Sequence, residues 1–126
     1  MTSHDGLTVT HRRYVPHGHA HYGGGLVDGA YALGMFGDVA TELCIRTDGD
    51  EGLFASYSEV QFKAAIRAGD VVEAAGTITR TGSRSRTIDF TLTVVCRSDP
   101  DTGASAAVVL DDPVLAATAV GTVVIP

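Results

Sequence analysis

Tryptophan is absent from this 126-residue chain, and only two cysteines, Cys44 and Cys96, are present. Both cysteines lie in apolar stretches, which favours reduced core thiols over a disulfide. No apolar run reaches the roughly 18 residues that a membrane-spanning helix needs. The first residues also lack the apolar segment of a secretory signal. These absences predict a soluble, cytoplasmic protein.

Positive charge is scarce as well. Nine Lys and Arg residues stand against fifteen Asp and Glu residues, which gives a formal net charge of -6. General nucleic-acid binding requires a basic surface, so that function is not expected. An anionic ligand must instead be bound locally, by a few arginines or by backbone amides. The length suits one domain over residues 1–126 with a modest core.

No basic residue occurs from position 23 to position 45. This stretch starts with three glycines and continues as the pattern of one long helix to about residue 46. At about 100° per residue, small and apolar side chains form one stripe, which we expect to pack on a sheet: Leu26, Ala30, Leu33, Gly37, Ala40 and Cys44. The opposite stripe contains Asp28, Tyr31, Met35, Asp38 and Glu42. Three carboxylates without a cation nearby repel one another, so something else must compensate for their charge.

Strand patterns dominate the rest of the chain, at residues 7–15, 54–66, 71–80, 86–96 and 114–125, with a further short segment at 104–110. Residues 86–96 alternate most regularly between apolar and polar side chains. Short turns between strands require antiparallel neighbours. The sequence therefore predicts an α+β fold in which an antiparallel sheet wraps around one helix. One helix covers only part of such a sheet, so we expect at least a homodimer.

Four strings carry a family resemblance: Ala-His-Tyr-Gly-Gly at 20–24, Leu-Val-Asp-Gly-Ala at 26–30, Phe-Gly-Asp-Val-Ala-Thr-Glu-Leu at 36–43 and Asp-Gly-Asp-Glu-Gly-Leu-Phe at 48–54. With their surroundings, from about residue 18 to 97 and again from 113 to 124, they resemble the hotdog-fold 3-aminobutyryl-CoA ammonia-lyases, which are related to the β-alanyl-CoA ammonia-lyases. The histidine-rich loop before residue 21 and a longer 98–110 segment depart from that pattern.

The resemblance implies a carbon–nitrogen lyase that reversibly removes ammonia from 3-aminobutyryl-CoA, or a similar β-amino acyl-CoA, to give crotonyl-CoA, as in lysine fermentation. It implies no cofactor beyond the coenzyme A of the substrate, no metal, and a homodimer that assembles further into a tetramer or hexamer. Two alternatives stay open: an acyl-CoA thioesterase on the same fold, and an acyl-CoA-binding protein without activity.

This reaction needs a base for the α-hydrogen, a donor for the thioester oxygen and negative charge near the β-ammonium. Asp38 and Glu42 lie one helical turn apart, so we expect one to act as base and acid and the other to hold the ammonium, without deciding which. The alternative is a solvated acidic face. His21 is expected to bond the thioester oxygen or carry protons, unless it is a loop histidine bonded to backbone. Substituting Asn at Asp38 or Gln at Glu42 is predicted to abolish turnover.

Amides of residues 24–27, expected at the helix N-terminus, suit the developing charge on the thioester oxygen. The expected substrate contacts are Tyr22, Gly24, Gly25, Leu26, Asp28 and Tyr31, although Asp28 also suits a capping role. Tyr31, Met35 and Phe36 suggest a small acyl pocket. The expected sites for the phosphates of coenzyme A are Gly82, Ser83, Arg84 and Arg86, with an ordinary turn as the alternative. His17, His19 and His21 could share one face and bind a metal, but a solvated loop is favoured.

Overall fold

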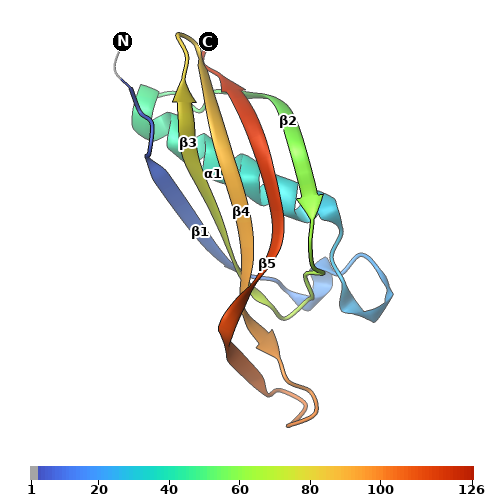
Figure 1. Cartoon of the computed structure of the whole chain (residues 1–126). Helices are drawn as coiled ribbons and strands as arrows, with labels where there is room; N and C mark the ends of the chain where they lie inside the picture. The colour runs from blue at the N-terminus through green and yellow to red at the C-terminus, as the bar shows by residue number, and fades with distance from the viewer. Residues whose placement is uncertain (1–2) are drawn as a thin grey trace.

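The protein is described here by a computed structural model that covers residues 3–126 (Figure 1). Its elements follow one another in this order: β1 (Thr8–Tyr14), the short 3-10 turns η1 (His17–His19) and η2 (Gly23–Gly25), α1 (Gly29–Asp48), β2 (Leu53–Phe62), β3 (Val71–Thr81), β4 (Ser85–Ser98) and β5 (Ala107–Val124). No helix in this part of the chain is long and apolar enough to cross a membrane.

The five strands form one sheet in the order β1-β3-β4-β5-β2, and every neighbouring pair is antiparallel. The helix α1 lies across one face of this sheet (Figure 1). Strands β1 and β2 are therefore the two edges, and the buried side chains of the sheet and of α1 form one core. The predicted α+β arrangement is confirmed.

Local capping sets the limits of α1. The Asp28 carboxylate accepts a hydrogen bond from the Tyr31 amide at 3.2 Å, which is the usual N-cap arrangement. Gly49 ends the helix in the left-handed conformation (φ 64°), and its amide donates to the Ile45 carbonyl. Gly24 and Gly25 also have left-handed φ angles, of 77° and 76°. The glycines thus form a separate turn, and the prediction that residues 24–27 supply the amides of the helix N-terminus is wrong.

The buried face of α1 consists of Ala32, Met35, Phe36, Val39, Ala40, Leu43 and Cys44. Phe36 stacks on Phe90 of β4 with ring centroids 4.9 Å apart. Of the predicted apolar stripe, only Ala40 and Cys44 lie on this face, whereas Ala30 is exposed. Burying large side chains removes more apolar surface from water than burying small ones, so the helix turns its bulkier side toward the sheet.

Irregularities in β2 overturn part of the strand prediction. The strand ends at Phe62 rather than at residue 66, and its pairing with β5 shifts register between Ser58 and Gln61. Glu59 has a positive φ of 52° within this shift, as expected of a bulge. Tyr57 packs inward and its hydroxyl donates to the Leu33 carbonyl at 2.7 Å, while Glu59 and Gln61 are exposed. The alternation of the sequence predicts that Tyr57, Glu59 and Gln61 share one face of the strand, and the bulge makes this prediction wrong.

Strand β5 is continuous where two segments were expected. Its register against β4 shifts between Val94 and Cys96, which leaves the residues around Pro113 outside the ladder. Proline lacks an amide hydrogen and is tolerated at such a bulge. Beyond the bulge, β4 and β5 continue as a two-stranded ribbon that extends away from the body of the sheet (Figure 1). The regular alternation predicted for β4 is confirmed, because Ile88, Phe90, Leu92 and Val94 are all buried.

Candidate active site

An open pocket of about 520 Å³ lies where α1 begins. One wall comes from the junction between η2 and α1, the other from the segment after β2, and β5 contributes two buried alanines. The lining residues are Tyr22, Leu26, Val27, Asp28, Gly29, Ala32, Phe62, Lys63, Ala64, Ala65, Ile66, Ala116 and Ala117. Asp28 is the one carboxylate and Lys63 the one cation among them. The pocket is thus largely apolar, with one charge of each sign.

The Asp28 carboxylate has two different surroundings. One oxygen, Oδ1, caps the helix through the Tyr31 amide. The other, Oδ2, lies 4.0 Å from Nδ1 of His21, and the side chain is 34% exposed. The capping role suggested by the sequence is therefore present. The second oxygen remains free to accept a hydrogen bond from a bound cationic group, so a substrate contact by Asp28 stays a prediction consistent with the geometry.

Backbone hydrogen bonds join the two walls of the pocket. The amides of His21 and Tyr22 both donate to the Leu26 carbonyl, at 2.8 and 2.9 Å, and this closes the glycine loop. The Val27 amide donates to the Ile66 carbonyl at 3.0 Å, and the Ala68 amide donates to the Gly25 carbonyl at 2.7 Å. The loop that carries His21 is thereby fixed to a segment some 40 residues away in sequence. Gly24 and Gly25 shape this loop but do not line the pocket.

Asp38 and Glu42 do not line this pocket, and their side chains meet β1 instead. Asp38 Oδ2 accepts a hydrogen bond from Arg13 Nη2 at 3.1 Å. Glu42 Oε1 lies 2.8 Å from His11 Nε2, and Glu42 Oε2 accepts from Arg46 Nε at 2.7 Å.

The hydrogen bonds from Arg46 and His11 hold the pKa of Glu42 below its ordinary value. The compensating positive charge thus comes from β1 and from the last turn of α1. Asp38 is ten residues from Asp28, about 15 Å along the helix axis. The catalytic roles of Asp38 and Glu42 stay predictions.

The remaining side chains predicted before α1 have separate neighbours. Tyr31 turns toward β1: its hydroxyl lies 2.9 Å from His19 Nδ1, and the Arg13 guanidinium lies 5.6 Å from its ring centre. His17 approaches Gly69, and His21 approaches Asp28. No group of three or more metal-binding side chains occurs within residues 3–126.

Met35 and Phe36 were expected to line the acyl pocket, and this prediction is wrong. Both side chains are buried in the core, with exposures of 1% and 0%. Cys44 is also a buried free thiol, and its desolvation raises its pKa. The pocket touches α1 only at its first residues, up to Ala32. Met35 and Phe36 lie farther along the helix, on the face that packs against the sheet.

The hairpin between β3 and β4 uses Arg86 for its own structure. Arg86 is 4% exposed, and its guanidinium donates to both carboxylate oxygens of Asp48, at 2.7 and 3.2 Å. It also donates to the carbonyls of Gly82 and Ser85. Arg86 therefore anchors the end of α1 and is not available to a phosphate. Ser83 and Arg84 are exposed, but the hairpin lies at the end of the sheet opposite to the start of α1 (Figure 1), whereas the pocket is lined by Asp28 and Gly29 at that start.

Sequence reasoning missed the wall formed by Phe62, Lys63 and Ala64, and the alanines of β5. No motif marks these residues. They reach the pocket through the pairing of β2 with β5, in which Phe62 lies opposite Ala117, and the amides of Lys63 and Ala64 both donate to the Ala116 carbonyl. These contacts depend on the pairing of β2 with β5, and the order of strands in a sheet cannot be read from a single sequence.

Comparison with known proteins agrees with this architecture. Residues 24–95 match the family model of the Thioesterase superfamily. The chain is 51% identical, over 107 residues and 85% of each chain, to a 3-aminobutyryl-CoA ammonia lyase of Acetoanaerobium sticklandii.

Solved structures show the same likeness. A β-alanyl-CoA:ammonia lyase from Clostridium propionicum superposes with a TM-score of 0.90 at 36% identity, covering 96% of this chain and 86% of that one. A hexameric hotdog-fold thioesterase of Campylobacter jejuni superposes with a TM-score of 0.71 at 16% identity, covering 90% and 78%; this last likeness concerns the fold alone. The predicted hotdog fold is confirmed, and the chain belongs to the Thioesterase superfamily, in the branch that contains these ammonia lyases.

Proposed function

We propose that this protein catalyses the reversible elimination of ammonia from 3-aminobutyryl-CoA, or a closely similar β-amino acyl-CoA, to give crotonyl-CoA. The identity to a 3-aminobutyryl-CoA ammonia lyase supports this reaction. The observation that carries the proposal is the position of Asp28, whose second oxygen stands free in a largely apolar pocket in which Lys63 is the one other charged side chain. A β-ammonium acyl group requires that combination, because its charge needs a carboxylate and its carbon chain needs apolar walls.

In the proposed reaction, Asp28 holds the β-ammonium group and His21 takes the α-proton. The electron pair of the α-carbon–hydrogen bond forms the new carbon–carbon double bond as the carbon–nitrogen bond breaks. Ammonia leaves with the bonding pair and takes the proton from His21, so that ammonium is released and His21 returns to its starting state. The thioester oxygen, which gains negative charge on the way, lies toward the N-terminus of α1, where the helix dipole favours an anion.

Asp38 and Glu42 remain a second proposed location for proton transfer. Their hydrogen-bond partners on β1, Arg13 and His11, argue for a structural role in the single chain. The kinetics of variants can separate the two locations. The intracellular setting of lysine degradation also belongs to the proposal, because it follows from the family resemblance rather than from the geometry.

A homo-oligomer completes the proposal. Strand β2 is an edge of the sheet, and Leu53 and Phe62 on it are 66% and 58% exposed. Phe62 also lines the pocket. A second copy paired along β2 would cover these apolar side chains and narrow the pocket mouth. We propose a homodimer of this kind, assembled further into a tetramer or hexamer.

The test mixes the purified protein with crotonyl-CoA and ammonium and follows the absorbance of the enoyl thioester. Loss of absorbance that depends on both ammonium and protein is expected, and its complete absence would contradict the proposal. Superfamily membership also favours a second candidate, hydrolysis of the thioester. Release of free thiol without ammonium, measured with a chromogenic disulfide, would identify that activity instead.

A further inference from the structure

We propose that Lys63 and Arg67 form the binding site for the phosphate groups of coenzyme A, at the mouth of the pocket. This inference rests on the proposed function only in taking the substrate to be a coenzyme A thioester. Such a ligand brings several negative charges to a protein whose own net charge is -6. Its phosphates therefore need cations that the fold does not already use.

Lys63 and Arg67 are such cations. Lys63 is the one lysine of the chain and lines the pocket. Arg67 follows Ile66 and pairs through its backbone with Leu26, both of which line the pocket. Both side chains are exposed. Within residues 3–126, neither forms an ion pair with a carboxylate. Lys63 supplies a mobile point charge, and Arg67 supplies a planar fork that suits phosphate oxygens.

Arg97, a further cation next to this segment, is already neutralised. Arg97 donates to both oxygens of Asp70, at 3.0 and 2.9 Å, and Asp70 is fully buried. The hydrogen bond to Asp70 raises the pKa of Arg97. Arg97 also donates to the Ala65 carbonyl, and Asp70 accepts from the Arg67 amide at 2.8 Å. This ion pair therefore holds the backbone of the segment that presents Lys63 and Arg67.

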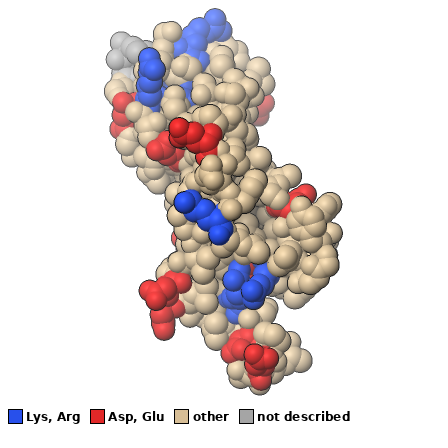
Figure 2. All heavy atoms as spheres, turned by 45° about the vertical axis from the view of Figure 1, so that its right-hand side comes forward, with Lys and Arg blue, Asp and Glu red and all other residues tan. Residues whose placement is uncertain are grey.

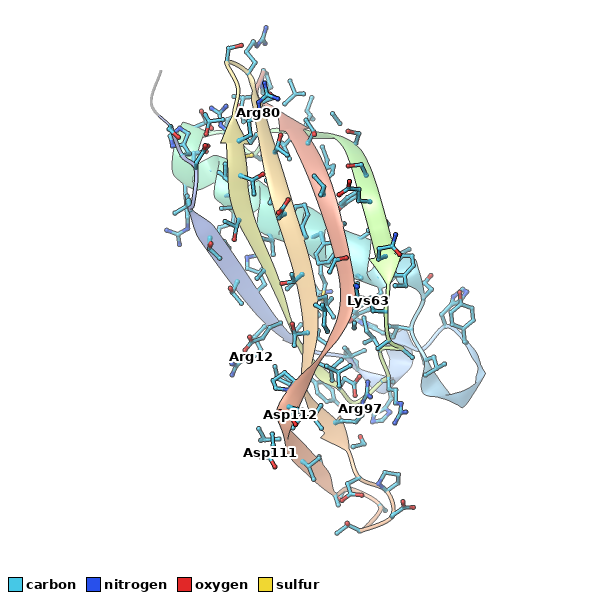
Figure 3. The ribbon with its side chains drawn as sticks, viewed as in Figure 1. Arg12, Lys63, Arg80, Arg97, Asp111 and Asp112 are labelled. Atoms are coloured by element: carbon cyan, nitrogen blue, oxygen red, sulfur yellow. The ribbon has the colours of Figure 1, made fainter. Side chains whose placement is uncertain are left out.

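A rigid backbone favours binding, because little loop entropy is lost when the ligand arrives. The Lys63 amide is fixed to the Ala116 carbonyl at 2.8 Å. Figure 3 shows Lys63 beside the end of β2, Arg97 below it, and Arg80 near the top of the molecule. Figure 2 shows that basic and acidic residues form small separate groups on an otherwise uncharged face. Because no large basic surface is present on this face, a multiply charged anion is expected to bind at one of the small groups of cations.

The hairpin predicted from the sequence is poorly placed for the pocket of its own chain. Ala117, on the pocket wall, pairs with Leu92 of β4. Arg86, where the hairpin joins β4, lies six residues away along that strand, which is about 20 Å at the usual rise per residue. Lys63, in contrast, belongs to the pocket wall itself. The exposed hairpin residue Arg84 is therefore the competing site that the experiment must include.

The experiment measures the dissociation constant of coenzyme A by calorimetry for the unmodified protein, the K63A/R67A double variant and two single-site controls. Arg84→Ala tests the hairpin, and Arg80→Ala removes an exposed cation that is far from the pocket. The double variant is expected to bind coenzyme A at least about tenfold more weakly and to lose much of the salt dependence of binding. Binding of pantetheine, which lacks the phosphates, is expected to stay unchanged, and so is binding of coenzyme A by Arg80→Ala.

Unchanged affinity of the double variant for coenzyme A would overturn the inference, and a loss seen with Arg84→Ala instead would assign the phosphates to the hairpin. The result is independent of the reaction. If the double variant binds more weakly as expected but the unmodified protein adds no ammonia to crotonyl-CoA, the phosphate site stands and the lyase proposal fails. If ammonia is added but the double variant binds coenzyme A normally, only the phosphate site fails. In an active protein, the double variant is expected to raise KM with little change in kcat.

Discussion

The first turn of α1 and its middle both carry carboxylates, but the two regions treat them differently. At the first turn, Asp28 uses one oxygen as a helix cap and leaves the other beside a pocket, with His21 at 4.0 Å. In the middle, Asp38 accepts a hydrogen bond from Arg13 of β1, and Glu42 contacts both His11 of β1 and Arg46 of its own helix. The difference shows that an acidic stripe on a helix does not locate a site by itself. Only the contacts with β1 show which of these carboxylates already has a partner and which does not.

The comparison also bears on proton transfer. Hydrogen bonds from Arg46 and His11 lower the pKa of Glu42, so this group remains ionised at neutral pH and is a weak base. A carboxylate held in that state is suited to fixing β1 against α1. The pocket end of the helix combines a free carboxylate oxygen of Asp28 with the adjacent imidazole of His21.

The largest effect is expected from Asp28→Asn. Asparagine caps a helix about as well as aspartate, so the fold should be retained while the charge that holds the β-ammonium disappears. We expect kcat/KM for ammonia addition to fall by about 10²-fold or more, with an almost unchanged melting temperature. Asp28→Ala is the matched control, because it also removes the cap and should cost about 1 kcal/mol of stability. Full activity of Asp28→Asn would remove Asp28 from the site.

A smaller effect is expected from Gly29→Ala. A Cβ at this position would lie 2.6 Å from Cζ of Phe62, so the Phe62 ring must move into the pocket mouth or away from it. We expect KM for crotonyl-CoA to rise by about tenfold. This corresponds to about 1.4 kcal/mol, which lies within the usual cost of overpacking. Adding Phe62→Ala to the same chain should reverse most of this increase. A double variant as impaired as Gly29→Ala alone would show that the contact does not control access.

The middle of the helix is tested by Asp38→Asn and Glu42→Gln. If these residues only pair with β1, each variant should lose less than about tenfold in kcat/KM, which is below the usual contribution of a general acid or base. The same assay and substrate as for Asp28→Asn give a direct comparison. Abolished turnover in either variant, with the fold intact by circular dichroism, would instead support the prediction made from the sequence.

The smallest effect concerns stability in acid. The pKa of Glu42 is lower in the folded protein than its ordinary value of 4.5. A lowered folded pKa gives stability that is present above the ordinary pKa and is lost as the pH falls through the folded value. Below about pH 4.5 the unmodified protein should therefore lose stability more steeply than Glu42→Gln does. Urea unfolding from pH 6 to pH 3 measures both slopes, and parallel curves would show that the His11–Glu42–Arg46 contacts add no stability.

Local sequence patterns predicted those parts of the fold that depend on neighbouring residues in the chain, such as strand alternation and helix capping. The alternation at Ile88, Phe90 and Leu92 located β4, and Asp28 was recognised as a possible cap. The missing parts depend on contacts between distant segments. Arg13 and His11 contact the carboxylates of α1 from another element, and Lys63 reaches the pocket through strand pairing. The bulges near Glu59 and Pro113 also change which side chains share a face. The alternation of apolar and polar residues in the sequence does not reveal such bulges.

The central claim is that the acyl thioester binds at the N-terminal end of α1. A crystal structure of the protein with crotonyl-CoA in the absence of ammonium tests it most directly, because the enoyl thioester then has no amine to add. We predict that the thioester and its four-carbon chain lie in the pocket beside Asp28, His21 and Gly29. Electron density for the thioester beside Asp38 and Glu42, with this pocket empty, would contradict the account.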